Sequence, residues 1–211
     1  MAVIEGGTTA SLAEVDTTFL AMRVTHRPPQ VIGWYSVAGS SGALTGAAAA
    51  APVFSMRNTG ANLLMIRSVR IGFIVTTAFT AAQGLAYGLL KANSFTVSDS
   101  GQTALYTAGA NKHRNSFTNI TSPPDIRIST TAAITAGTRT LETAPLVVAG
   151  GAASGLGAAM GITPLLSHDT GDYPLILAQN EGFIITNDIL MGAIGVIRLM
   201  VNVEYAEVTA F

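Results

Sequence analysis

The sequence LLMIRSVRIGFIVTT, residues 63–77, gives the clearest indication of the fold. Apolar side chains recur at every second position along most of it, and Ser68, Arg70 and Gly72 fall between them. A period of two residues is typical of a β-strand with one buried face, because successive side chains of a strand point to opposite sides. The segment therefore predicts a half-buried strand whose core side carries Met65, Val69, Ile71, Phe73 and Val75.

Residues 196–208 show the same alternation along a second long strand. Its two series are Ile197, Leu199, Val201, Val203 and Tyr205 on one side and Arg198, Met200, Asn202 and Glu204 on the other. The connection before it, DILMGAIG at 188–195, contains two glycines. We therefore expect a hairpin between this strand and the apolar segment 182–187.

Shorter β-rich segments, bounded by Gly, Pro, Asn and Ser, occur along the rest of the chain. They are VIGWYSVA (31–38), PVFSMRN (52–58), TALYTAG (103–109), DIRISTT (125–131) and ITAGTRTLE (134–142). The small residues of 40–51 predict a loop, although its alanines would also fit a helical turn. Many short strands with almost no helical period predict an all-β sandwich or barrel.

Residues 1–30 differ from this β-rich body, which we assign to 31–211. They end in Arg27-Pro28-Pro29, and the residue before a proline is disfavoured in a helix. Their apolar residues are too sparse for a core but suit the groove of a partner. We therefore predict an extended N-terminal arm that binds through Ile4, Leu12, Val15, Phe19, Leu20 and Met22.

The composition points to an assembly. Of 211 residues, 49% are apolar and only 11% are charged, with a formal net charge of −1. Nucleic acid and anionic lipid are not expected as partners, because the chain has no strongly basic balance. The absence of cysteine excludes disulfides, thiolate nucleophiles and Cys-ligated metals. Because charge keeps free proteins apart, we expect buried lateral interfaces, most simply in a homotrimer.

No membrane association or secretion is expected. The uncharged stretches 71–90 and 143–168 are interrupted by Thr, Ser, Gly or Pro, which fits a lipid-facing helix badly. The N-terminal sequence has no basic region followed by an apolar run, so it does not resemble a secretory signal.

One motif suggests an enzyme. LVVAGGAASGLGAAMG (146–161) places Gly151, Gly155 and Gly157 in a spacing that resembles the cofactor loop of short-chain dehydrogenases, and Tyr87 and Lys91 match that family's Tyr-x-x-x-Lys pair. The order is wrong, however, because the pair precedes the loop, and the remaining chain is too short for a doubly wound sheet. We predict a mobile Gly/Ala loop that binds no dinucleotide.

The remaining candidate residues do not form a reaction centre. His26, His113 and His168 are far apart and have no metal-ligand spacing, and there is no G-x-S-x-G nucleophile motif. Asp169 and Asp172 could offer oxygens to a cation, although a plain turn fits better. The basic cluster Lys112-His113-Arg114 lacks interleaved aromatics and is expected at a loop tip. We therefore predict no catalytic, cofactor-binding or metal-binding residues, and no enzyme.

Three blocks of the sequence resemble structural proteins of tailed bacteriophages. They are IEGGTTASLAEVD (4–16) with LAMRVTHRPP (20–29), ANSFTVSDSGQTALYTAGANKHRNSF (92–117) through DIRISTTAAITAGTRTLETAPL (125–146), and YPLILAQNEGFIITNDILMGAIGVIRLMVNVEYAEV (173–208). The alanine-rich segment 47–51 and the glycine-rich segment 147–161 depart from that pattern.

The resemblance implies a jelly-roll β-sandwich that decorates or cements the outside of a phage head. Its partner would then be the major capsid protein, and its location the capsid surface of a virion assembled in the host cytoplasm. The alternatives are a tail or head-fibre component that binds a receptor and, more remotely, a short-chain-dehydrogenase-like enzyme.

Overall fold

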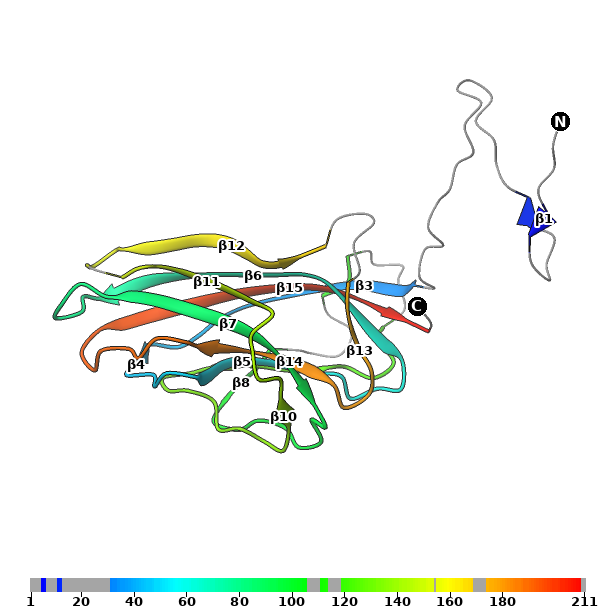
Figure 1. Ribbon diagram of the computed structural model, residues 1–211, viewed down its shortest axis with the longest axis horizontal. Helices are drawn as coiled ribbons and strands as arrows, with labels where there is room; N and C mark the ends of the chain where they lie inside the picture. Colours follow the sequence, from blue (N-terminus) through cyan, green and yellow to red (C-terminus); the bar gives the residue numbers. More distant parts are fainter. Residues whose placement is uncertain are drawn as a thin grey trace, which may run out of the picture.

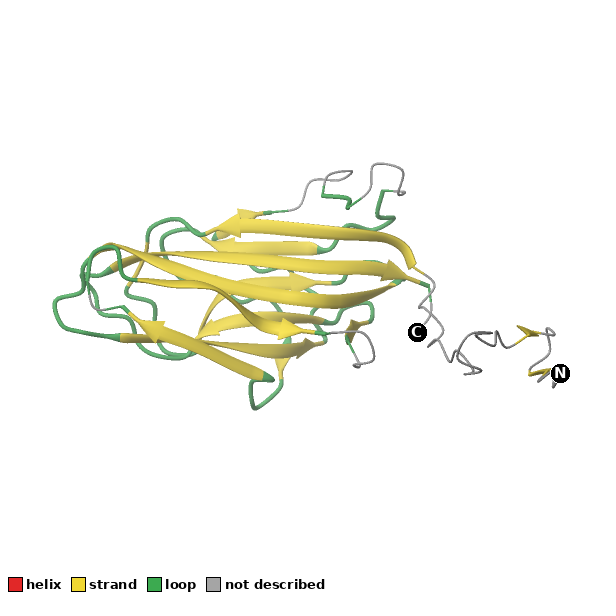
Figure 2. Cartoon of the chain, turned by 90° about the horizontal axis from the view of Figure 1, so that it is seen from above, coloured by secondary structure: helices red, strands yellow, loops and turns green. Residues whose placement is uncertain are grey.

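The computed structural model describes residues 5–6, 11–12, 31–105, 111–113, 119–153, 155–168 and 174–209. None of these residues is helical, and the strands from Val31 onward form two antiparallel sheets packed face to face (Figures 1 and 2). The predicted all-β fold and β-sandwich are therefore confirmed, while the jelly-roll arrangement stays a prediction.

The first sheet has seven strands in the described part of the chain. Its order is β10-β7-β14-β5-β9-β8, and β11 also pairs with β7. The strands are β5 (Ala51–Arg57), β7 (Gly84–Asn93), β8 (Gln102–Ala104), β9 (Asp125–Ser129), β10 (Thr140–Leu141), β11 (Val147–Ala152) and β14 (Gly182–Asn187).

The second sheet has six described strands in the order β12-β6-β15-β3, with β13 on β6 and β4 on β15. These strands are β3 (Val31–Ser40), β4 (Leu44–Thr45), β6 (Leu63–Thr77), β12 (Ala159–Ser167), β13 (Leu175–Leu177) and β15 (Val196–Val208). The sandwich thus begins at Val31. A separate antiparallel pair, β1 (Glu5–Gly6) and β2 (Ser11–Leu12), lies within the predicted arm.

Eight of the longer strands pair in a nested pattern. β3 pairs with β15, β5 with β14, β6 with β12, and β7 with β11. Both ends of the sandwich domain are therefore neighbours in one sheet, and the chain crosses between the sheets several times. This arrangement depends on contacts between residues far apart in sequence, such as Val31 with Val208.

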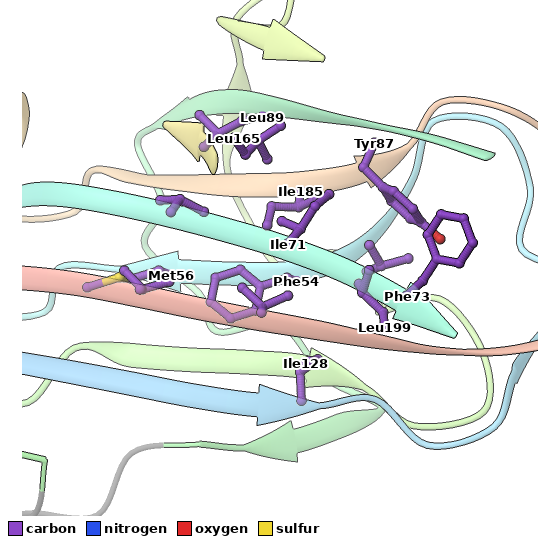
Figure 3. Packing of buried hydrophobic residues seen from close by; sticks show 14 of the residues in the cluster. Phe54, Met56, Ile71, Phe73, Tyr87, Leu89, Ile128, Leu165, Ile185 and Leu199 are labelled. Atoms are coloured by element: carbon purple, nitrogen blue, oxygen red, sulfur yellow. The ribbon is translucent and has the colours of Figure 1, made fainter. Parts of the chain in front are cut away.

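The core lies between the two sheets, and the apolar side of β15 supplies its centre. Ile197, Leu199, Val201, Val203 and Tyr205 are all fully or almost fully buried, as their alternation predicts. Across the sheets, the rings of Phe73 and Tyr87 meet with centroids 6.2 Å apart (Figure 3). Each large apolar side chain buried here contributes about 1.5–3 kcal/mol.

Because of a β-bulge, Met65 lies on the opposite side of β6 from the one that the alternation predicts. β15 residues Glu204 and Tyr205 pair with Ser68 and Ile66, so Arg67 is an extra residue on β6. An extra residue shifts the alternation, because each further position then faces the opposite way. Val69, Ile71, Phe73 and Val75 face the main core as predicted, whereas Met65 packs outside it with Ala206 and Val208.

The predicted hairpin between 182–187 and 196–208 is wrong. β14 is a central strand of the seven-stranded sheet, between β5 and β7, and β15 lies in the other sheet between β6 and β3. Every residue of β14 is buried. A central position, with a strand on each side and a covered outer face, buries more of these apolar side chains than a hairpin at a sheet edge would. Residues 188–195 therefore cross between the sheets.

The alanine-rich segment forms a turn and not a helix. Residues 46–50 join the short strand β4 to β5, and Ala50 has a φ of 59°. The predicted loop at 40–51 is confirmed apart from β4 and the end residues Ser40 and Ala51, which belong to β3 and β5, and the helical-turn alternative is wrong.

Segments 94–101 and 130–139 lie over the outer face of the seven-stranded sheet. Phe95 lies against Gly182 of β14, and Arg57 of β5 donates to its carbonyl oxygen at 3.2 Å. Ile184, which points away from the core, is nevertheless fully buried. Much of the predicted strand 134–142 belongs to this layer, so only its last part forms β10.

Candidate assembly surface

The described residues hold no cluster of three or more His, Asp or Glu side chains that could bind a metal. His26, Asp169 and Asp172 lie outside the described residues. His113 is exposed, whereas His168 is partly exposed and its Nε2 atom is buried without a hydrogen-bond partner in the described part of the chain.

The glycine-rich motif forms a strand, which corrects the prediction of a mobile loop. β11 pairs with β7 from Val147 to Ala152, and Gly150 permits this close approach because a Cβ there would lie 2.6 Å from the carbonyl oxygen of Leu85. The turn that follows needs Gly157, whose φ is 78°. All strand pairs of the described residues are antiparallel, so the parallel sheet and helix of a dinucleotide site do not surround this motif.

Tyr87 and Lys91 do not form a catalytic pair in this fold. They lie four residues apart on β7, which separates their Cα atoms by about 13 Å. The Tyr87 hydroxyl lies in the core without a described partner, and burial raises the pKa of Tyr87 well above its ordinary value. A catalytic base needs the opposite shift, toward the working pH.

An uncharged apolar flank runs along one edge of the sandwich, where β11 and β12 lie close together (Figure 1). Residues 143–167 contain no Asp, Glu, Lys or Arg. Alternate residues of β11 are exposed because one side of the strand faces the core and the other faces solvent: Val147 and Ala149 pack against the core, whereas Val148 is 50% exposed. With β12 and the intervening turn, the apolar flank consists of Leu146, Val148, Leu156 and Ile162.

The end of the sandwich where β6 turns into β7 adjoins this flank, because the N–H of Ala153 donates to the carbonyl of Gln83 at 2.7 Å. There, residues 79–83 and 190–195 line an open hollow of about 430 Å³. No lining residue is charged, so the hollow offers no group for acid–base chemistry. The exposed apolar residues of this end, which we call the apolar end, are Ile189, Leu190 and Ile194.

Polar side chains hold the 188–195 connection in place beneath these apolar residues. Buried Asn187 donates to the carbonyl oxygens of Ala47 and Ala48 at 3.2 Å, and to that of Ile189 at 2.6 Å. Gln83 donates to the carbonyl of Leu190 and accepts from the N–H of Gly192 at 3.0 Å. The backbone of this segment is thus tied to two neighbouring segments, and its apolar side chains are presented to solvent on a fixed base.

The basic cluster is not at a free loop tip, as far as it is described. Lys112 forms a β-bridge with Tyr35 of β3, and the N–H of His113 donates to the carbonyl of Trp34 at 2.9 Å. The cluster therefore extends the edge of the six-stranded sheet, while Arg114 lies outside the described residues.

Most of the predicted arm also lies outside the described residues. Ile4, Val15, Phe19, Leu20 and Met22 belong to that part, and Leu12 is described only as a residue of β2. The sequence did not single out the apolar flank, although the uncharged stretch 143–168 with Leu146 and Val148 at alternate positions was its signal.

No described residues form a helix that could cross a membrane. No known protein family matches the chain, and neither does any curated protein or solved structure.

Proposed function

We propose that this chain is a structural virion protein that binds the outer surface of a tailed-bacteriophage head and stabilises it, without catalysing a reaction. The apolar flank and the adjoining apolar end carry this proposal. Together they hold seven of the ten large apolar residues that are exposed in the described structure. Large apolar side chains that are exposed on adjoining parts of an otherwise well-packed domain mark an interaction site.

The strand order supports the jelly-roll arrangement that such a role suggests. A jelly roll consists of eight strands in two sheets with Greek-key connections. The nested pairs β3–β15, β5–β14, β6–β12 and β7–β11 fit that description, and β6–β15 and β7–β14 complete the two four-stranded sheets. We therefore assign these eight strands to a jelly roll, with the shorter strands β4, β8, β9, β10 and β13 as additions.

Self-association fits the same surface. A cyclic trimer is held by heterologous contacts, in which one patch of each subunit meets a different patch of the next. The apolar flank and the apolar end are two adjoining patches of this kind. Packing one against the other would remove from water the uncharged surface that 11% charged residues leave exposed.

Head binding tests the main proposal. Purified chain is added to heads of its phage from which it is absent, and the particles are separated by sedimentation and reconstructed. We expect saturable binding of many symmetric copies on the outer surface of the head. Density confined to a few copies on the tail or a fibre would favour the receptor-binding alternative, and the absence of density on any virion particle would contradict both.

Lysine substitutions test the proposed self-association. Val148→Lys and Ile162→Lys place a charge in the apolar flank, and burying it without a partner disfavours the contact. We expect each variant to dissociate at concentrations at least about tenfold higher than those at which the native chain does. Sedimentation equilibrium measures this, and Val97→Lys is the control, because Val97 is similarly exposed but lies in the 94–101 segment. Equal association of all four proteins would contradict the proposal.

A further inference from the structure

The two sheets differ in what lies over their outer faces. Residues 94–101 and 130–139 cover the seven-stranded sheet, whereas outward side chains in the middle of the six-stranded sheet, including Ala38, Arg70 and Arg198, are exposed. The outward side chains of Met65 and Ala206, nearer to Val208, are buried. This exposed part of the sheet is available to a partner. Its chemistry is set by the outward residues of β3, β6 and β15.

Arginine dominates the charge of this face. Three described ion pairs involve Arg57, Arg127 and Arg139. The other described Lys and Arg side chains have no ion-pair partner within the described residues, and three of them lie on this face: Arg67, Arg70 and Arg198. Glu204 is the one carboxylate among its described outward residues.

The spacing of these arginines suits a broad partner. Arg70 is opposite Asn202, four residues along β15 from Arg198, so about 13 Å separates the two positions along the strands. The guanidinium of Arg67 lies over the ring of Trp34, 5.6 Å from its centroid. Half-exposed Met200 lies between Arg198 and Asn202 on the same face.

These residue types are those of a protein interface. Arg, Trp and Met are enriched at interface cores, and the planar guanidinium binds carboxylates through two parallel hydrogen bonds. A nucleic-acid site would instead carry several cations and several stacking aromatics along one path. Here Glu204 lies among the arginines, and Trp34 is the one tryptophan of the chain.

We infer that this surface, the arginine face of Trp34, Arg67, Arg70, Met200 and Arg198, docks on a carboxylate-rich protein surface. The inference rests on the proposed function, in which that surface belongs to the capsid shell. The start of the sandwich agrees with it, because Val31, to which residues 1–30 connect, lies beside Val208 in this same sheet.

Charge reversal tests the arginine face. Arg70→Glu and Arg198→Glu are compared with Lys91→Glu, which changes an unpaired cation of the other sheet. Each substitution exchanges +1 for −1 and so lowers the formal net charge from −1 to −3. We expect about tenfold or greater loss of head affinity for both arginine variants, weaker salt dependence than in the native chain, and little change for Lys91→Glu. Circular dichroism and thermal melts verify that all variants fold.

A second probe separates this inference from the proposed function. On immobilised poly-L-glutamate at low salt, we expect retention of the native chain and of Lys91→Glu, and earlier elution of both arginine variants. If the native chain binds no heads, the proposed function is wrong, and the poly-L-glutamate column alone tests whether the arginine face binds carboxylates. Equal behaviour of the arginine variants and Lys91→Glu on both probes would overturn the inference. Binding to double-stranded DNA that Arg70→Glu abolishes, with head binding intact, would also overturn it.

Discussion

Replacing Asp99 by alanine is expected to lower the free energy of unfolding by about 3–5 kcal/mol. Asp99 and Arg139 form an ion pair whose side chains are 0% and 4% exposed. The same carboxylate oxygen accepts from the N–H of Gly137 at 2.8 Å, and the Arg139 guanidinium lies 5.0 Å from the centroid of the Phe95 ring. Removal of Asp99 leaves the arginine charge buried without a counter-charge. It also releases the 130–139 segment from the layer over the seven-stranded sheet.

Urea denaturation followed by intrinsic fluorescence measures this change. Glu142→Ala is the control, because Glu142 is exposed and its carboxylate only accepts from Asn93 at 3.1 Å. Such a surface change is expected to stay within about 0.5 kcal/mol. A double variant, Asp99→Leu with Arg139→Met, replaces the pair by apolar side chains and is expected to recover most of the loss. An Asp99→Ala protein within about 1 kcal/mol of the native chain would show that the pair does not hold this layer.

Deletion of residues 1–20 is expected to abolish attachment to heads while leaving the melting temperature almost unchanged. Every strand of the two packed sheets begins at or after Val31, so the truncated chain keeps the whole described core. The deleted apolar residues include Ile4, Leu12, Val15, Phe19 and Leu20. Each would contribute about 1.5–3 kcal/mol on burial in a partner, before the cost of ordering the arm.

Calorimetry and head sedimentation test the two parts of this prediction separately. Deletion of residues 2–3 is the control, since it shortens the arm and removes none of the predicted binding residues. Full affinity of the truncated chain would assign attachment to the sandwich alone. A truncated chain that fails to fold would show that the arm contributes to the core.

The local pattern of the sequence was enough to predict the main strands. Alternation in residues 63–77 and 196–208 gave β6 and β15 with their bounds, and the change of pattern after Pro29 gave the start of β3. A strand's two faces depend only on its own successive residues, so a period of two can be read without knowing any neighbour. The same holds for the class of the fold, because strands in a chain with almost no helical pattern bury their apolar faces by packing sheet on sheet.

The candidate surfaces and the pairing of strands required the tertiary structure. The apolar series of 182–187 is compatible with many partners, because backbone N–H and C=O groups pair equally well with any strand. The bulge at Arg67 likewise arises from the match between β6 and β15, and it decides that Met65 leaves the main core.

Asp99 and Arg139 are forty residues apart and follow no motif, and Val148 is exposed because the side of β11 that carries it faces away from the core. The sequence by itself thus determined the longest strands and which way most of their side chains alternate. Only the tertiary structure decided which strands are central, which edges and faces stay open, and which distant charges meet. These outcomes depend on long-range packing, in which each strand competes for neighbours with all the others.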